Sequence, residues 1–193
     1  MRGLKGQKGL TIMEMLMATL ILTIVGTLTT LFFIQGSNLW ESITGQSDLR
    51  SVARNALTYM SQELRNATRT GTGNPSPNMA IPSKPNNHSI GFYLPADLDG
   101  NGLIIDTLGA TEWDTSNKIH YQYVPGQNML RRLEKGNQFI ISHEVANIEF
   151  EDNSIDSSLA INEVRIKLTL QRILPQNKIA SVTMASIVKL RNQ

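Results

Sequence analysis

The sequence predicts an α+β protein in which a long N-terminal α-helix packs on an antiparallel β-sheet. Residues 10–34 form an apolar run, and after it apolar residues recur at steps of three and four, as on one face of a helix. Short segments of alternating polarity follow in the C-terminal half, the pattern of strands with one buried face. The 193 residues are enough for one compact domain and an additional element.

Residues 10–34 are long enough to cross a membrane as a helix. They contain 25 residues with one charged side chain, Glu14, and at ~1.5 Å per residue they span the ~30 Å hydrocarbon core. A secretory signal peptide has an apolar run of only ~7–15 residues and then a small-residue cleavage site, and no Ala-x-Ala site follows Ile34. Residues 1–9 are basic and contain no acidic side chain, so we expect them on the cytoplasmic side and the C-terminal part outside.

The charge of the chain argues against a nucleic-acid partner. The chain carries 18 Lys and Arg and 16 Asp and Glu, a net charge of +2. Arg2, Lys5 and Lys8 lie in the first nine residues; without these three, 15 basic side chains stand against 16 acidic ones, a net charge of −1. No basic cluster with interleaved aromatic residues follows. The absence of cysteine excludes disulfides, thiolate metal sites and a thiol nucleophile.

Glu14 is the unusual residue of the apolar run. A carboxylate near the centre of a bilayer costs roughly 2.5–3.5 kcal/mol, and less near the interface. Glu14 either stays hydrated at the level of the lipid headgroups or has a functional partner, and its position alone leaves both interpretations open.

Residues 9–16, Gly-Leu-Thr-Ile-Met-Glu-Met-Leu, resemble the type IV prepilin cleavage motif, whose common form is Gly-Phe-Thr-Leu-Ile-Glu-Leu. Leu10 stands where the motif usually has Phe, and Met13 where it usually has Ile. The resemblance implies that residues 1–9 are a leader removed by a prepilin peptidase between Gly9 and Leu10, and that the new N-terminus at Leu10 is N-methylated. It also implies a partner for Glu14, the new N-terminal amine, commonly that of a neighbouring subunit.

An amphipathic helix is expected over residues 35–70, continuous with the membrane segment or closely following it. Gly36 and Gly45 are expected to bend or loosen it. Its apolar stripe is typical of a core-facing surface and consists of Leu49, Val52, Ala53, Ala56, Met60, Leu64 and Ala67. Residues 71–88 are rich in Pro and Gly and predict a loop.

The sheet region is expected over residues 89–193. The predicted strands are residues 89–94, 118–124, 129–133, 145–150, 164–170 and 180–190. Residues 125–128, Pro-Gly-Gln-Asn, predict a tight turn between the second and third of these strands.

Residues 54–67 and 188–192 are similar to the corresponding segments of PilW-type minor pilins and the J pseudopilins of type II secretion. The resemblance implies a pilin-like fold and a structural role: a minor subunit that initiates or joins a type IV pilus or a secretion pseudopilus. The implied partners are other major and minor pilins or pseudopilins and the inner-membrane assembly platform. The implied location is the inner membrane with a periplasmic or extracellular domain. Residues 71–145 carry no such resemblance.

Asp97, Asp99, Asn101 and Asp106 are the candidate metal ligands, and Ca²⁺ is the candidate metal. Oxygen-bearing side chains at alternate positions followed by Gly102 begin a typical Ca²⁺ loop, although the twelfth position is Leu108, not Glu. A polar turn without metal explains the same residues.

Three functions are therefore weighed. The first is the structural subunit, which performs no catalysis. The second is a signal-anchored extracytoplasmic binding module, Ca²⁺-dependent in one form, that does not polymerise. The third, a membrane-tethered enzyme, lacks a motif: His88, His120 and His143 have no ligand spacing, and no phosphate loop or nucleophile elbow appears.

Overall fold

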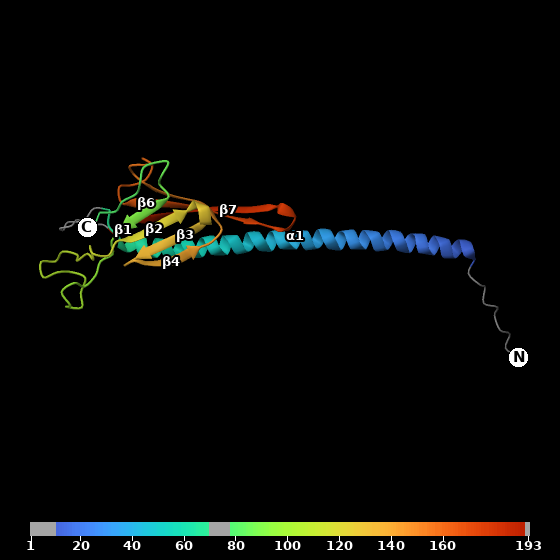
Figure 1. Cartoon of the computed structure of the whole chain (residues 1–193), viewed down its shortest axis with the longest axis horizontal. Helices are drawn as coiled ribbons and strands as arrows, with labels where there is room; N and C mark the ends of the chain where they lie inside the picture. Colours follow the sequence, from blue (N-terminus) through green and yellow to red (C-terminus); the bar gives the residue numbers. More distant parts are fainter. Residues whose placement is uncertain (1–10, 70–77, 192–193) are drawn as a thin grey trace. The chain divides into compact units, whose positions relative to one another are not determined.

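The computed structural model describes residues 11–69 and 78–191. The described part contains one helix, α1 (Ile12–Asn66), seven strands, and two short 3₁₀ helices at Pro125–Gln127 and Pro175–Asn177 (Figure 1). The chain divides into two compact units, Met1–Ile43 and Thr44–Gln193, and α1 contributes to both. The α+β class predicted from the sequence is confirmed.

Helix α1 is unbroken from Ile12 to Asn66, so the helix continues through Gly36 and Gly45, where the sequence suggested bending or loosening. Gly45 is buried, and a Cβ added there would lie 2.8 Å from a methyl group of Leu174. The absence of a side chain at this position therefore serves close packing. The helix ends at Asn66, before residue 70, and Ala67 and Thr68 follow it as buried residues.

The strands form two antiparallel sheets, where the sequence suggested one. The first has the order β1-β2-β3-β4 and the second the order β5-β6-β7. Their bounds are β1 Ser89–Phe92, β2 Ile119–Val124, β3 Met129–Glu134, β4 Asn137–Ser142, β5 Val145–Asp152, β6 Glu163–Ile173 and β7 Ile179–Lys189. Strand β4 is absent from the sequence prediction, because Phe139, Ile140 and Ile141 are consecutive and do not alternate with polar residues.

The chain leaves the first sheet between β4 and β5, where Glu144 adopts a positive φ of 64°. The residues before β1 then connect the two sheets. The backbone N–H of Phe150 in β5 donates to the carbonyl of Asn87 at 2.8 Å, and the Asn87 side chain donates to the carbonyl of Phe150 at 3.1 Å. Asn87 is 2% exposed, and a buried amide is stabilised by such hydrogen bonds.

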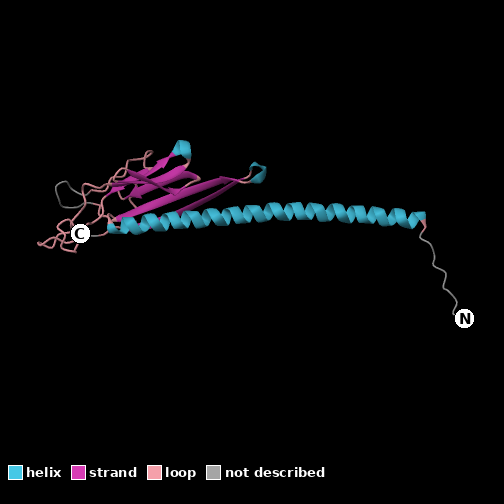
Figure 2. Ribbon diagram, turned by 60° about the horizontal axis from the view of Figure 1, so that its bottom comes forward, coloured by secondary structure: helices cyan, strands magenta, loops and turns pink. Residues whose placement is uncertain are grey.

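The core of the second unit lies between α1 and the two sheets. The predicted stripe is confirmed: Leu49, Ala53, Met60, Leu64 and Ala67 are 0% exposed. They pack with inward-facing residues of both sheets, and the largest fully buried ones are Tyr121, Phe92, Phe150, Ile90, Ile119, Leu130, Ile148, Ile166 and Leu168. Figure 2 shows the strands of this unit along one side of the later part of α1, with the loops gathered at one end. Burying each Leu, Ile or Phe contributes about 1.5–3 kcal/mol, so this stripe fixes the helix on the sheets.

Candidate functional site

Glu14 lies in the first turn of α1 and caps its N-terminus. The backbone N–H of Thr11 donates to Glu14 Oε2 at 2.9 Å, and the Thr11 hydroxyl donates to the same oxygen at 3.1 Å. The backbone N–H of Glu14 donates to Thr11 Oγ1 at 3.2 Å. This reciprocal arrangement is a capping box, which satisfies backbone donors that the helix leaves unpaired. Sequence reasoning missed it, although Thr-x-x-Glu at the start of an apolar run is its signal.

One oxygen of the Glu14 carboxylate stays open. Both hydrogen bonds from Thr11 end on Oε2, and within residues 11–69 and 78–191 no hydrogen bond or ion pair reaches Oε1. The Glu14 side chain is exposed. Glu14 can therefore cap its own helix and still accept a hydrogen bond from a donor outside this chain. Gly9 and Leu10 lie outside the described residues, so the cleavage and methylation positions stay predictions.

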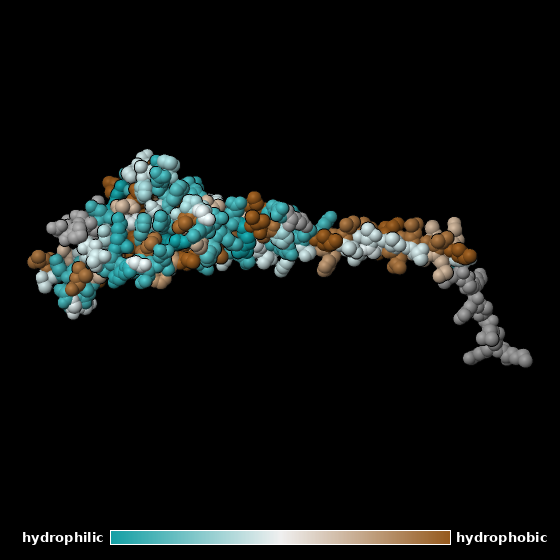
Figure 3. Space-filling model, viewed as in Figure 1, coloured by the Kyte–Doolittle hydropathy of each residue, from teal (hydrophilic) through white to brown (hydrophobic). Residues whose placement is uncertain are grey.

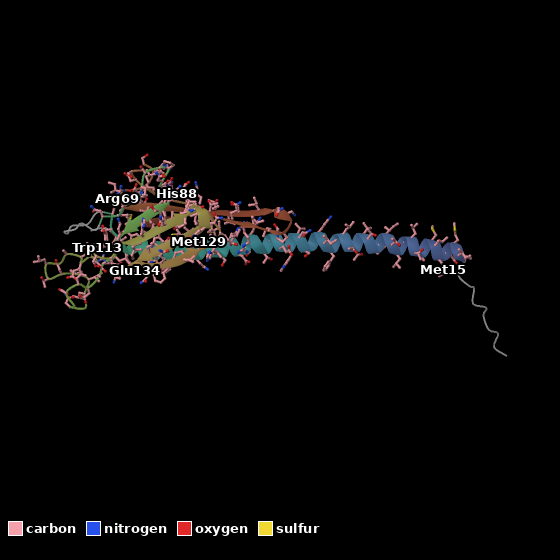
Figure 4. The ribbon with its side chains drawn as sticks, viewed as in Figure 1. Met15, Arg69, His88, Trp113, Met129 and Glu134 are labelled. Atoms are coloured by element: carbon pink, nitrogen blue, oxygen red, sulfur yellow. The ribbon has the colours of Figure 1, made fainter. Side chains whose placement is uncertain are left out.

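The first part of α1 presents an apolar surface on all sides. Every large apolar side chain from Ile12 to Ile34 is at least 50% exposed, and Figure 3 shows apolar residues following one another along this stretch. Met15, labelled in Figure 4, is one of them. Helix α1 is long and apolar enough to cross a membrane, and none of its most apolar window is buried inside the structure.

The threonines in this stretch do not break its apolar character. Their hydroxyls donate to backbone carbonyls three or four residues earlier, over 2.7–2.9 Å. The donors are Thr19, Thr23, Thr27, Thr29 and Thr30. A hydroxyl bonded in this way needs no water, so the helix can lie against lipid or against another apolar helix.

Exposed apolar residues continue beyond Ile34. Leu39, Trp40 and Ile43 are 64–72% exposed. Tryptophan is enriched at membrane–water interfaces, where its ring is apolar and its N–H reaches water. Sequence reasoning assigned residues 35–70 to one amphipathic segment and did not separate this stretch, whereas the buried stripe begins only at Gly45.

The predicted metal loop holds itself together with its own carboxylates. Asp97 accepts hydrogen bonds from the backbone N–H groups of Gly100, Asn101 and Gly102 at 2.7–3.1 Å. These bonds lower the pKa of Asp97, that from Gly102 most. The Asn101 side-chain amide donates to Asp99 at 2.8 Å. The Asn101 oxygen in turn accepts from the backbone of Leu103. This is the geometry of a polar turn.

Glu112 joins this loop, and Asp106 does not belong to the same group. Oxygens of Asp97, Asp99 and Glu112 lie within 4.8 Å of one another, and Glu112 also accepts from the Leu98 N–H at 2.6 Å. Asp106 instead accepts from the N–H groups of Leu108 and Ala110 in the next turn. Sequence reasoning could not find Glu112. Its carboxylate comes close to Asp97 and Asp99 only because backbone hydrogen bonds pair residues 94–96 with residues 112–114.

A second polar cluster fixes α1 on the first sheet. Arg132 of β3 is 6% exposed and lies between Glu63 of α1, 2.9 Å away, and Glu134, 2.6 Å away. The hydroxyl of Tyr121 in β2 donates to Glu63 at 2.5 Å. Burial and Glu63 raise the pKa of Tyr121, and the hydrogen bond from Arg132 lowers the pKa of Glu134. Figure 4 labels Glu134 at the end of β3. The cluster is structural, since its groups satisfy one another.

The three histidines lie in separate surroundings. His88 Nδ1 is 2.7 Å from the carbonyl oxygen of Ile148, His143 is exposed, and burial together with Lys118 lowers the pKa of His120. Among the described residues, the carboxylates around Asp97 form a group with metal-ligand spacing and no histidine joins it.

No protein-family model matches this sequence, and the comparisons with curated proteins and with solved structures find no match either.

Proposed function

We propose that the chain is a minor pilin or pseudopilin, a structural subunit that initiates or joins a type IV pilus or a type II secretion pseudopilus. The observation that carries this proposal is the start of α1, where an exposed apolar surface contains one charged side chain, Glu14, in its first turn. Such a surface requires a cover of lipid or of other apolar helices. In a filament the same helix has both in turn, lipid before assembly and neighbouring helices after it.

The proposed topology places residues 1–9 in the cytoplasm and the second unit outside. Arg2, Lys5 and Lys8 favour the cytoplasmic side. Residues 10–40 of a helix extend about 45 Å, close to the ~40–45 Å thickness of a bilayer with its headgroups. Trp40 then lies at the outer interface, where tryptophan is favoured. The location would be the inner membrane before assembly.

Processing by a prepilin peptidase creates the partner for Glu14. Cleavage between Gly9 and Leu10 releases a positively charged α-amine, which does not exist in the uncut chain. The open Oε1 of Glu14 supports pairing with the amine of a neighbouring subunit, because this oxygen is unused within the described residues. An opposite charge offsets part of the desolvation cost of the carboxylate in an apolar bundle. Assembly would therefore depend on cleavage.

The chain performs no catalytic step in this proposal. Its second unit has a core of its own between α1 and the sheets, as a domain exposed outside the membrane requires. Its partners would be the prepilin peptidase, the assembly platform, and other pilins or pseudopilins. The competing function, a signal-anchored binding module, would use the helix only as an anchor and the loop of Asp97 as a ligand site.

Cysteine crosslinking in the native host tests assembly directly. The chain contains no cysteine, so a Leu20→Cys variant, at a side chain that is 57% exposed, adds a thiol in the apolar stretch without a competing one. We expect disulfide crosslinks from this position to a second cysteine introduced into the apolar helix of the neighbouring pilin subunits, and their loss when Gly9→Val is combined with Leu20→Cys. Assembly through this helix would be contradicted if Leu20→Cys alone formed no crosslinks, or if it formed as many when Gly9→Val prevents cleavage.

A further inference from the structure

A groove runs between α1 and β7 within the second unit. Two adjoining cavities of about 300 and 290 Å³ share Arg54 and Met184. On the helix side the groove contains Arg50, Arg54 and Arg65, and on the strand side it follows residues 181–186 of β7. Because consecutive residues of β7 line it, including both faces of the strand, the groove follows the edge of the strand.

Among the described strands, none pairs with the outer edge of β7. Strand β7 ends the order β5-β6-β7, and its hydrogen-bonded strand neighbour is β6. In an antiparallel edge strand, the N–H and C=O groups of alternate residues point away from the sheet. Among the described residues, no backbone hydrogen bond joins 180–188 to anything other than β6. The groove therefore has a row of free backbone donors and acceptors along one wall.

The three arginines on the other wall have no acidic partner. Arg50, Arg54 and Arg65 are exposed, and no ion pair joins them to any carboxylate of the described residues. Residues 1–10, 70–77 and 192–193 contain no Asp or Glu, so no acidic side chain of this chain lies outside the described part. The residues that line the two cavities include no acidic one.

We propose that this groove binds an extended, acidic segment of a partner protein, which adds to β7 as a further strand and places its carboxylates against Arg50, Arg54 and Arg65. Helix α1 and strand β7 run in the same direction along the groove. The Ser61 and Ser186 hydroxyl oxygens are 3.3 Å apart, and later in both elements the backbone N–H of Arg191 donates to the carbonyl of Ala67 at 3.1 Å. The arginines are thus spaced along the path of the added strand.

The spacing of the arginines suits a strand. Arg50 and Arg54 are one helical turn apart, about 6 Å along the axis. Side chains on one face of a strand repeat every ~6.8 Å, so acidic residues at alternate positions can meet Arg50 and Arg54. Arg65 lies about 16 Å further along the helix, so it is reached by a carboxylate two or three repeats further along the same strand. The free strand edge favours a peptide over a nucleic acid, and no aromatic side chain lines the cavities to stack on bases. This inference goes beyond the proposed function and does not depend on filament assembly.

Peptide binding to the full chain in neutral phosphatidylcholine nanodiscs tests the inference. The probe is a blocked peptide of about eight residues that alternates Thr and Glu, long enough to follow the groove. One control peptide has Gln in place of Glu, and another keeps Glu but is N-methylated at alternate residues, which removes the N–H groups a strand needs. The protein variants are Arg50→Gln with Arg54→Gln and, as a control outside the groove, Arg131→Gln. Arg131 of β3 hydrogen-bonds Gln127 and Gln138, and no ion pair among the described residues includes it.

We expect the acidic peptide to bind, with a loss of about tenfold or more in the double variant and no loss in Arg131→Gln. Both control peptides should bind at least about tenfold more weakly. Equal binding of the Gln peptide, of the N-methylated peptide or of the double variant would overturn the inference. So would self-association of the chain that depends on Arg50 and Arg54, because the groove would then hold a second copy. Unchanged thermal unfolding of the double variant would show that it is folded.

Discussion

At the scale of single residues, Glu14 has an observed role in capping α1 and a proposed role in pairing between subunits, and the two differ in what they require of its side chain. Capping of α1 requires an acceptor at this position, and the amide oxygen of glutamine can supply it. Pairing with the amine of a neighbouring subunit requires the negative charge. Substitutions that separate the acceptor from the charge can therefore assign the role.

Glu14→Gln is expected to preserve cleavage and the helix terminus but to lower incorporation into filaments by about tenfold or more, the effect of losing about 1.4 kcal/mol. Glu14→Ala should lower incorporation at least as much and also remove the cap. Processing is read from the intact mass, and incorporation from the crosslinks of Leu20→Cys. Normal incorporation of Glu14→Gln would reduce Glu14 to a capping residue.

Glu151 and Asp156 are expected to contribute to the acid stability of the second unit. The hydrogen bond from Lys84 lowers the pKa of Glu151. Hydrogen bonds from the backbone N–H and the hydroxyl of Ser158, followed by that from Arg165, lower the pKa of Asp156 to about 2. Because both pKa values are below their ordinary values of 4.5 and 3.8, the stabilisation is present above those values and is lost as the pH falls toward 2.

The urea midpoint of the full chain in detergent should therefore fall between pH 5 and pH 2, and fall less in a Glu151→Gln, Asp156→Asn variant. The variant should already be less stable at neutral pH, because it lacks the charged partners of Lys84 and Arg165. If the urea midpoints of the wild-type chain and of the variant fell equally steeply with pH, other groups would control acid unfolding.

At the scale of elements, α1 and most strands could be predicted because periodicity reports burial. Strand β6 was predicted from its alternation, and its inward residues Val164, Ile166, Leu168 and Leu170 are 0% exposed. Strand β4 could not be predicted, because it lies at a sheet edge and four of its six residues are exposed. The division into two sheets could not be predicted either. It depends on Asn87, which bonds Phe150 far along the chain, and on Glu144, whose backbone has a positive φ.

In the candidate site too, features that depend on local sequence could be predicted and features that depend on long-range contacts could not. The exposed apolar stretch and Glu14 could be predicted, because they depend on local sequence. The approach of Glu112 to Asp97 and the buried cluster of Arg132 with Glu63 could not, because the partners are 15 and 69 residues apart in the chain. Periodicity also cannot reveal that the edge of β7 lies open beside three arginines.

The two parts of α1 should respond differently to the same substitution. Leu64 is 0% exposed in the core, and Leu64→Ala should lower the free energy of unfolding of the second unit by about 2–5 kcal/mol. Leu20 is 57% exposed, and Leu20→Ala should leave that free energy within about 0.5 kcal/mol. Urea unfolding followed by tryptophan fluorescence measures both in a Trp40→Phe background, which leaves the fluorescence of Trp113. A large effect of Leu20→Ala would mean that the first part of α1 belongs to the folded core.

At the scale of the whole molecule, one helix serves two environments. Its later part is covered by the sheets of its own chain, and its first part has no cover within the described residues. The structure thus combines a domain with its own core and an apolar helix that needs lipid or other subunits. A filament subunit requires this combination, because the domain must stay folded while the helix exchanges lipid for neighbouring helices.

The most direct test of this account is the intact mass of the chain after co-expression with a prepilin peptidase, measured beside a Gly9→Val variant. The account predicts a chain that begins at Leu10, with or without one added methyl group, and an uncut Gly9→Val chain. A wild-type chain that still begins at Met1 would contradict the pilin class and favour the signal-anchored binding module.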